Sequence, residues 1–334
     1  MTTRKKSTQY IIGVDLGGTN IAAAALDEAG AHTHALRSEP TRADQGPDAV
    51  VDRMVRMIDT VIAETIAETG AKRSAFIGVG VGAPGPLDRD RGVVLVAPNL
   101  GWHNIALRDI IGDQVGLKAT LDNDANCATL GEWWLGAARG GRNVIGMTIG
   151  TGIGGGVIIE GKLYHGSSDI AGEIGHMTID STGRWCKCGN YGCLEQYASG
   201  TAIARRAREA LTADSDSLMH RMVDGDLDRL TAAIVYEASK NGDMLALEVV
   251  HDTARFLGAG VASMVNIFNP DIVVIAGGVT QAGDALFEPL EREVRRRAFK
   301  AAVDAVRIVP GALPGTAGIV GAVATFKQQA LGAV

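Results

Sequence analysis

The sequence contains no long uninterrupted apolar run. Its longest apolar stretch, "NVIGMTIGTGIGGGVII" from Asn143, is broken throughout by glycine and threonine. A membrane-spanning helix requires about 20 consecutive, mainly apolar residues. The basic N-terminus is also not followed by the apolar segment that a secretory signal peptide requires. We therefore expect neither a transmembrane span nor a signal peptide, and we expect a cytoplasmic protein.

The chain also lacks a strong excess of charge of either sign. Its 32 Lys and Arg residues stand against 38 Asp and Glu residues, which gives a formal net charge of −6. The basic runs are short and lie beside acidic or polar residues, whereas nucleic-acid-binding proteins carry clustered positive charge. We therefore expect neither a nucleic acid nor a membrane as partner.

Two common nucleotide-binding motifs are missing or incomplete. No G-x-x-x-x-G-K-[ST] sequence occurs, which excludes the P-loop class. Two G-x-G-x-x-G matches begin at Gly80 and Gly150, but a dinucleotide-binding fingerprint must be followed at once by a helix. Pro84 and Pro86 interrupt the first match, and the second continues into the strand-like "GVIIEGKLYHG". We therefore reject a Rossmann oxidoreductase.

Glycine, in contrast, is abundant. The chain has 44 glycines among 334 residues, roughly twice the usual share, and its length is typical of two domains or lobes. Strand-like runs alternate with helix-like runs, which predicts an α/β fold. The expected strands cover residues 10–16, 75–82, 118–122, 144–149, 155–160, 271–276 and 306–309. The expected helices cover residues 47–69, 125–138, 199–211, 245–268, 283–299 and 316–330.

Cysteine is scarce but concentrated. Three of the 4 cysteines lie in "CKCGNYGCLEQ" and, with His176 upstream, form the pattern H-x9-C-x-C-x4-C. Three thiolates and one imidazole suit tetrahedral Zn²⁺, so we expect zinc at His176, Cys186, Cys188 and Cys193. Four protein ligands leave no position for substrate, which indicates a structural metal. Reduced cysteines in a tight loop or a redox pair are the alternatives, and Cys127 is expected to be a small core residue.

The sequence also contains an internal repeat. "IIGVDLGGTNIAAAALDEAG" and "VIGMTIGTGIGGGVIIEGK" align at a constant offset, with Ile12 on Ile145 and Asp15 on Thr148. Each copy has the order strand, glycine-rich turn, strand, so we expect a duplicated hairpin, one in each lobe. Backbone N–H groups in such turns bind phosphate, and Thr19 and Thr151 add hydroxyl donors. Asp15 is suited to hold Mg²⁺ through water. Ordinary hairpin glycines would explain either copy alone.

Seven motifs occur in order along the chain: "VDLGGTN", "GAPGPLD", "PNLGW", "LDNDANCA", "GTGIGGG", "GEIGH" and "CKCGNYGCLEQ". With these motifs the chain resembles bacterial sugar kinases of the ROK family, and most of all their glucokinase branch, from about residue 10 to 328. The resemblance implies a two-lobed actin-like ATPase (ribonuclease H-like) fold with a ligand cleft between the lobes. We expect a small N-terminal lobe over 1–122, a large lobe with the zinc loop 176–193 over 123–315, and a helix at 316–334 that returns to the first lobe.

The resemblance also implies roles for individual residues. Asp124 takes the position of the catalytic base, at a strand-to-helix junction where the helix dipole favours a carboxylate; a helix N-cap is the alternative. The implied sugar-binding residues are Asn99, Asn123, Asp124, Glu173, His176 and Glu195. The implied ATP- and phosphate-binding residues are Asp15, Gly17, Gly18, Thr19, Asn20, Thr151, Gly152, Gly277 and Gly278.

The implied reaction is transfer of the γ-phosphoryl group of Mg²⁺·ATP to the 6-hydroxyl of glucose. Fructose, mannose and N-acetylmannosamine are alternative acceptors, and polyphosphate is an alternative donor. The same family includes sugar-sensing transcriptional repressors, which carry a DNA-binding region before the kinase-like part. Only "MTTRKKSTQ" precedes the first expected strand here, so we expect an enzyme and not a repressor. An even-numbered homo-oligomer, a dimer or tetramer, is the expected assembly.

Overall fold

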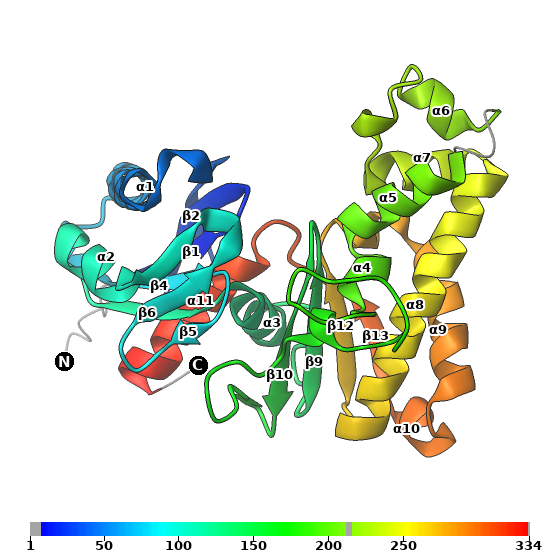
Figure 1. Ribbon diagram of the computed structural model, residues 1–334. Helices are drawn as coiled ribbons and strands as arrows, with labels where there is room; N and C mark the ends of the chain where they lie inside the picture. Colours follow the sequence, from blue (N-terminus) through cyan, green and yellow to red (C-terminus); the bar gives the residue numbers. More distant parts are fainter. Residues whose placement is uncertain (1–7, 212–215, 333–334) are drawn as a thin grey trace. The chain divides into compact units, whose positions relative to one another are not determined.

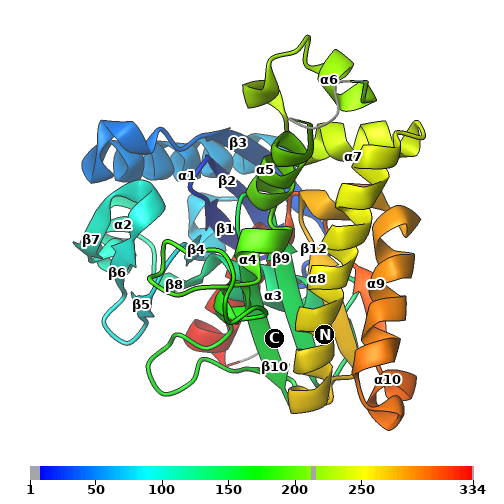
Figure 2. The same ribbon diagram turned by 45° about the vertical axis from the view of Figure 1, so that its right-hand side comes forward.

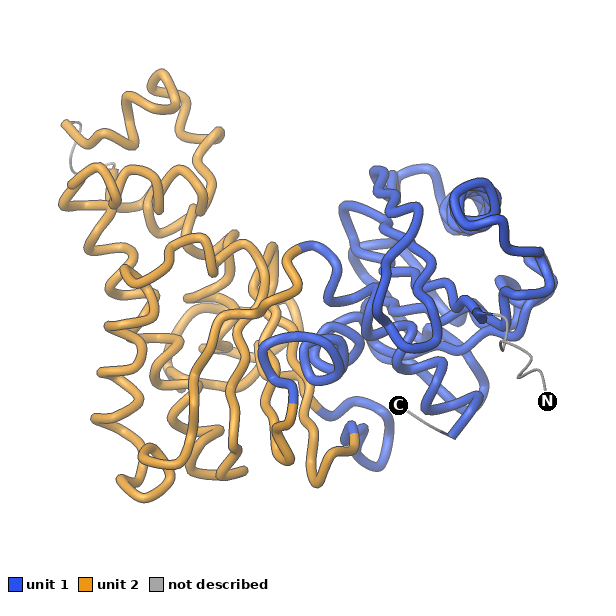
Figure 3. The backbone as a smooth tube through the Cα atoms, turned by 180° about the vertical axis from the view of Figure 1, so that it is seen from behind, with its two compact units in different colours: residues 1–139, 163–171, 315–334 blue, residues 140–162, 172–314 orange. Residues whose placement is uncertain are grey.

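Figure 1 shows the computed structural model of the chain, in which residues 8–211 and 216–332 are described. Backbone contacts divide the chain into two compact units (Figure 3). Unit 1 comprises residues 1–139, 163–171 and 315–334, and unit 2 comprises residues 140–162 and 172–314. The chain therefore passes from one unit to the other after residues 139, 162, 171 and 314. None of the helices in the described segments is long and apolar enough to cross a membrane.

Unit 1 is built on a five-stranded sheet with the strand order β3-β2-β1-β4-β8. Neighbouring strands are antiparallel between β1 and β2 and between β2 and β3, and parallel between β1 and β4 and between β4 and β8. The strands are β1 (Tyr10–Leu16), β2 (Asn20–Asp27), β3 (Thr33–Pro40), β4 (Phe76–Ala83) and β8 (Ala119–Asn123). The helices are α1 (Pro47–Thr69), α2 (Leu107–Val115), α3 (Asp124–Trp134) and α11 (Ala317–Phe326). A small sheet adds β5 (Leu87–Asp88), β6 (Val93–Ala97) and β7 (Trp102–Ile105).

The helices of unit 1 cover the two faces of this sheet. Ile12 and Val14 point to the face where α1 and α2 form the main core of the unit. The alternating residue Gly13, and Gly80 beside it on β4, point to the other face. There α11 packs so closely that a Cβ atom at either glycine would meet the backbone of Ile319 or Ala322. The glycines of "IIGVD" and "GVGVG" therefore allow a helix to lie directly on the sheet.

Unit 2 repeats this plan with the strand order β11-β10-β9-β12-β13. Its strands are β9 (Val144–Ile149), β10 (Ile153–Ile159), β11 (Lys162–Leu163), β12 (Ile272–Ala276) and β13 (Arg307–Pro310). Its helices are α4 (Glu195–Ala198), α5 (Gly200–Leu211), α6 (Leu218–Met222), α7 (Ala232–Lys240), α8 (Met244–Phe268), α9 (Asp284–Arg297) and α10 (Lys300–Ala305). The long helices α8 and α9 lie side by side and share an apolar core with β9, β10 and β12 (Figures 1 and 2).

The predicted duplicated hairpin is confirmed by the strand pairing. β1 and β2 are antiparallel with Leu16 opposite Ile21, and β9 and β10 are antiparallel with Ile149 opposite Ile153. In each unit the first hairpin strand then pairs in parallel with a later strand, β4 or β12. The order β2-β1-β4-β8 thus recurs as β10-β9-β12-β13, and the α/β fold class follows the sequence prediction.

The division of the chain differs from the expected lobes in the position of the boundary and in residues 163–171, which group with unit 1 and not with the large lobe. We placed the boundary at 122/123, whereas contacts keep α3 in unit 1 and divide the chain after residue 139. The physical reason is the close packing of α3 on α11, where a Cβ atom at Gly321 would meet the backbone of Cys127. The last helix, expected over 316–330, begins at Ala317 and also groups with unit 1. Residues 333 and 334 lie outside the described residues.

Candidate active site

The turn between β1 and β2 presents backbone groups at the end of the hairpin. Gly17 N donates to Asn20 O at 2.9 Å, which closes the turn. Thr41 holds the turn in place with two hydrogen bonds: its hydroxyl donates to Gly17 O at 2.7 Å, and its N–H donates to Thr19 O at 2.8 Å. Gly18, Thr19 and Asn20 are exposed. The predicted phosphate-binding residues of the first copy therefore form one anchored, accessible turn.

Asn99 lies beside this turn. It is an exposed residue of the short 3₁₀ helix Pro98–Leu100, and a Cβ atom at Gly18 would lie 3.3 Å from Asn99 Cβ. A side chain at position 18 would therefore crowd Asn99. One predicted sugar-binding residue and one predicted phosphate-binding residue are thus in direct proximity within unit 1.

Asp15 lies at the carboxyl half of β1 against the first turn of α11. Its carboxylate fills the space that a Cβ atom at Gly318 would take. Burial, together with the nearby negative charge of Asp124, raises the pKa of Asp15 to about 7. Two neighbouring carboxylates are a suitable environment for a cation, because a cation would stabilise both negative charges. The pair therefore fits the Mg²⁺ that accompanies ATP.

The first turn of α3 carries the predicted catalytic base. Asn123 is the N-cap of this helix, because its side-chain oxygen accepts from Ala125 N at 2.9 Å and from Asn126 N at 3.1 Å. Asp124 follows as the first helical residue, and its carboxylate accepts from Ala125 N at 2.8 Å. The N-cap of α3 is therefore Asn123 and not Asp124, the alternative that the sequence allows.

The equivalent turn of unit 2 is hydrogen-bonded to the start of α5. Gly150 N donates to Gly152 O at 3.0 Å, while Gly150 O accepts from Gly200 N, at the start of α5, at 2.8 Å. Thr151 is exposed on this turn, and its carbonyl accepts from the hydroxyl of Thr201 at 2.8 Å. The second copy of the motif therefore also forms a fixed turn with accessible residues.

Gly277 and Gly278 form the turn that follows β12. Both are exposed, and Gly277 has φ of 95°, a left-handed conformation that glycine adopts at little cost. A Cβ atom at Gly277 would meet the backbone of Ile149, the last residue of β9. This turn therefore lies at the same end of the sheet as the strand that leads to Thr151 and Gly152.

Glu195 contacts the phosphate-binding turn of unit 2 directly. Its Oε2 accepts from Ile153 N at 2.9 Å, and a Cβ atom at Gly152 would lie 2.5 Å from the same oxygen. The sequence predicts Glu195 as a sugar-binding residue only. Its contact with the turn is a second role that the sequence did not indicate, because it joins positions 42 residues apart.

Glu173 and His176 face each other across a single turn, as their spacing predicted. His176 Nε2 lies 4.0 Å from Glu173 Oε2. Partial burial raises the pKa of Glu173, the neighbouring imidazole of His176 opposes this shift, and the charge of Glu195 adds to it. Glu173, His176 and Glu195 therefore form one polar group in unit 2, whereas Asn99, Asn123 and Asp124 belong to unit 1.

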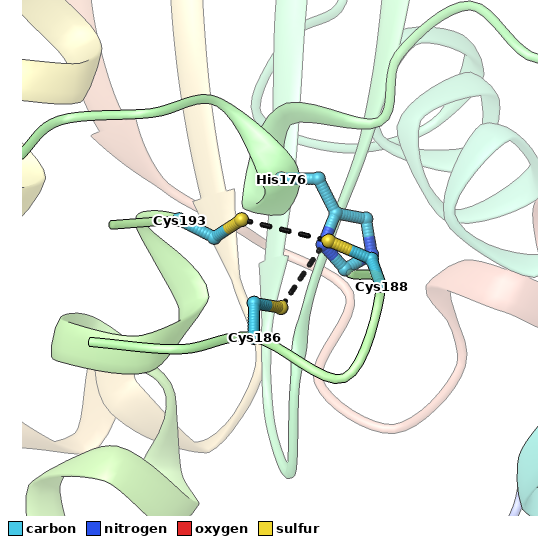
Figure 4. A group of neighbouring side chains, drawn as sticks. All are labelled: His176, Cys186, Cys188 and Cys193. Atoms are coloured by element: carbon cyan, nitrogen blue, oxygen red, sulfur yellow. Dashed lines mark hydrogen bonds between the residues drawn. The ribbon is translucent and has the colours of Figure 1, made fainter. Parts of the chain in front are cut away.

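The four predicted zinc ligands lie together (Figure 4). One liganding atom from each of His176, Cys186, Cys188 and Cys193 can be chosen so that all four lie within 4.8 Å of one another. Cys186 Sγ lies 3.7 Å from His176 Nδ1, and Cys188 Sγ lies 3.7 Å from Cys193 Sγ. Three thiols and one imidazole at this spacing fit a tetrahedral zinc ion.

Two side-chain amides lie beside this cluster. Gln196 Nε2 lies 3.6 Å from Cys186 Sγ, and Asn190 Nδ2 lies 3.7 Å from Cys193 Sγ. Burial and the adjacent thiols raise the pKa of Cys193 to about 12. A bound dication would favour the thiolate at this position, and amide donors would stabilise the thiolates further. The His176 ring lies between the two groups, with Nδ1 near Cys186 Sγ and Nε2 near Glu173 Oε2.

The comparisons with known proteins agree with this geometry. The chain matches the ROK family over residues 11–329. It is 38% identical to a glucokinase of Thermotoga maritima, over 96% of this chain and 98% of that protein. It resembles the crystal structure of a ROK family glucokinase from Streptomyces griseus in complex with glucose and AMPPNP, with a TM-score of 0.82 and 35% identity over 94% of this chain and 98% of that one.

Repressors of the same family are also similar. A xylose repressor of Caldicellulosiruptor bescii is 31% identical to this chain, over 98% of this chain but only 80% of the repressor. The repressor therefore has residues beyond the shared part, whereas the Thermotoga maritima glucokinase is matched almost completely. Together, the match of the family over almost the whole sequence and the repeated hairpins show that this chain belongs to the ROK family.

Proposed function

We propose that this protein is a glucokinase, which transfers the γ-phosphoryl group of ATP to the 6-hydroxyl of D-glucose. The observation that carries the proposal is the Asp124 carboxylate at the first turn of α3, whose charge is near enough to Asp15 to raise the pKa of that residue. Similarity over nearly the full length to proteins named glucokinase supports the same activity. The structure bound to glucose and AMPPNP, an ATP analogue, supports glucose and ATP as substrates.

In this mechanism Asp124 acts as general base. Its carboxylate accepts the proton of the 6-hydroxyl while the oxygen forms a bond to the γ-phosphorus, and the bond between that phosphorus and the bridging oxygen of ADP breaks. The products are glucose 6-phosphate and ADP. A positioned base of this kind contributes about 10²–10⁴ in rate. The protein otherwise contributes positioning and charge neutralisation.

The remaining predicted residues supply these two functions. We assign glucose binding to Asn99, Asn123, Glu173, His176 and Glu195, whose side chains offer directional donors and acceptors to adjacent hydroxyls. We assign the phosphates to the amides and hydroxyls of the two hairpin turns, formed by Gly17, Gly18, Thr19, Asn20, Thr151 and Gly152. Gly277 and Gly278 form the turn assigned to the nucleoside. Asp15 would hold Mg²⁺ through water, and that ion would neutralise phosphate charge.

The zinc ion is assigned a structural role. His176, Cys186, Cys188 and Cys193 would complete its four-coordinate shell and leave no open position for a substrate. Ligation by His176 would join the segment that carries Glu173 to the loop that precedes Glu195. The metal would thereby fix two carboxylates of the sugar site, as groups behind a site do in other metalloproteins.

A second candidate is a sugar-sensing regulator, which the similarity to xylose repressors favours. Steady-state kinetics with fructose, mannose, N-acetylmannosamine and glucose as acceptors, each with ATP and with polyphosphate, separates the possibilities. We expect the highest kcat/KM for glucose with ATP. Sugar binding without any ADP or phosphorylated product would refute the kinase, whereas a higher kcat/KM for another hexose or for polyphosphate would refute glucose or ATP. Sedimentation of the same sample tests the proposed even-numbered homo-oligomer.

A further inference from the structure

Asp122 is a buried carboxylate that the proposed mechanism does not use. It lies on β8 beside Asn123 and is 1% exposed. A buried carboxylate is stable only when hydrogen bonds or opposite charges replace the water that it loses. Three side chains from separate parts of unit 1 meet this one. Arg89 Nε lies 3.2 Å, His165 Nε2 lies 2.9 Å and Gln329 Nε2 lies 3.4 Å from Asp122 Oδ2.

The other oxygen of Asp122 is directed to the first turn of α3. Oδ1 accepts from Asn123 N at 2.8 Å and from Asn126 Nδ2 at 3.3 Å. These two residues flank Asp124 on either side along the helix, and Asn123 is also the N-cap. The position of the catalytic carboxylate therefore depends on groups that Asp122 holds.

Arg89 and His165 connect Asp122 to the loop of residues 163–171. His165 belongs to this loop, and its carbonyl accepts from Ala171 N at 3.0 Å, which closes the loop on itself. Asp169 anchors the same loop, because its carboxylate accepts from Arg89 N at 3.2 Å and lies 3.5 Å from Arg89 Nη1. Arg89 therefore pairs with a carboxylate on each side, one in β8 and one in the loop.

The loop leads directly into a predicted sugar-binding segment. It is the only internal piece of the described chain that belongs to unit 1 while the residues before and after it belong to unit 2. Only Gly172, with φ of 93°, separates Ala171 from Glu173. The contacts that anchor the loop therefore fix the position of the segment that carries Glu173.

We propose that Asp122 is a positioning residue for phosphoryl transfer, which fixes the first turn of α3 around Asp124 and, through Arg89 and His165, the loop that leads to Glu173. The inference rests on the proposed kinase function. One buried carboxylate would then position two predicted parts of the sugar site, which come from distant parts of the sequence. The phosphate-binding turns make no contact of this kind with it among the described residues.

A positioning role and a purely structural role predict different kinetics. Loss of general stability would lower the melting temperature and, through the amount of folded enzyme, the apparent kcat, but it would leave KM for glucose and KM for ATP unchanged. Loss of positioning would lower kcat per folded enzyme and raise KM for glucose, while KM for ATP stays close to that of the wild type. The melting temperature is also expected to fall, because the buried Asp122 loses a partner, so kcat is compared per amount of folded enzyme. Misplacement of a reacting group by about 1 Å costs on the order of 100-fold in rate, so partial loss of the anchor is expected to cost about tenfold.

The experiment compares His165→Ala with His165→Gln, whose amide nitrogen can donate to Asp122 in place of Nε2. His251→Ala, on the exposed side of α8 in unit 2, is the matched control. We expect kcat/KM for glucose to fall about tenfold in His165→Ala, to recover by more than half of that loss in His165→Gln, and to be unchanged in His251→Ala. If His165→Ala does not fold, Arg89→Lys takes its place, with the same expected fall in kcat, rise in KM for glucose and unchanged KM for ATP.

Each outcome decides the proposal. Equal kinetic constants in His165→Ala and the wild type, or equal increases in KM for glucose and for ATP, would overturn the positioning role while the kinase function stands. Failure of His165→Gln to recover any activity would also overturn it. A wild-type protein that phosphorylates no hexose would instead refute the proposed function, and the inference with it.

Discussion

Replacement of Asp15 by Asn is expected to stabilise the substrate-free protein at alkaline pH while it removes activity. The pKa of Asp15 rises from 3.8 to about 7 on folding, because the carboxylate is buried and lies near the charge of Asp124. The folded state therefore holds a proton that the unfolded state releases between about pH 4 and pH 7. The contribution of this group to stability is fully present below pH 4 and is lost as the pH rises through about 7.

The size of the effect follows from the shift. Each pKa unit corresponds to about 1.4 kcal/mol, so a shift of about three units corresponds to at most about 4 kcal/mol. Asn has the shape of the protonated acid and no charge. At pH 8 the free energy of unfolding of Asp15→Asn should therefore exceed that of the wild type by up to about 4 kcal/mol. Near pH 4 the two proteins should be equally stable.

The assay is urea denaturation in Mg²⁺-free buffer at several pH values between 4 and 8. A chelator is left out, because it would also remove the proposed zinc ion. Asp59→Asn is the matched control, since Asp59 is exposed on α1 in the same unit. A variant that is less stable than the wild type at pH 8, or equally more stable at pH 4 and pH 8, would refute this interpretation of Asp15.

Three further predictions concern the base, the metal and the packing of α11. Asp124→Asn should retain glucose binding in calorimetry but lose about 10²–10⁴ in kcat; retention of most of the turnover would exclude Asp124 as base. Cys188→Ser should lose zinc in elemental analysis, raise KM for glucose and lower the melting temperature, and a metal-free variant with unchanged KM would contradict the structural role. Gly80→Ala should destabilise the protein by about 1–3 kcal/mol in urea denaturation, because its Cβ atom would meet the backbone of Ala322. Unchanged stability would show that α11 can move away from the sheet.

The sequence predicted the long elements and the local motifs. The helix expected over 47–69 is α1, with the same ends, because Pro47 and Gly70 are strong start and stop signals. The hairpins follow from the repeat of apolar residues and glycine on either side of each turn. β3 was missed because "THALRSEP" is largely exposed and carries no alternating apolar pattern. The small sheet was missed because β5 has only 2 residues.

The grouping of His176, Cys186, Cys188 and Cys193 was also predictable, because all four residues lie within one short segment and their spacing is typical of a metal site. The anchor around Asp122 was not, since Arg89 and Asp169 are 80 residues apart and His165 and Asp122 are 43 residues apart. The one signal was an acidic residue in a strand next to "NDAN". The assignment of the N-cap to Asn123 also required the structure, because Asn and Asp are almost equally good caps.

The place of α11 in unit 1 has a consequence for how the protein is made. β1 and β4 emerge from the ribosome early, but the helix that covers one face of their sheet begins only at Ala317. The face of that sheet that carries Gly13 and Gly80 therefore stays uncovered while residues 140–314 are synthesised. Unit 2 can therefore complete its core before α11 covers this face of the sheet in unit 1. Chaperones that bind nascent chains would find their substrate in the first half of the sequence.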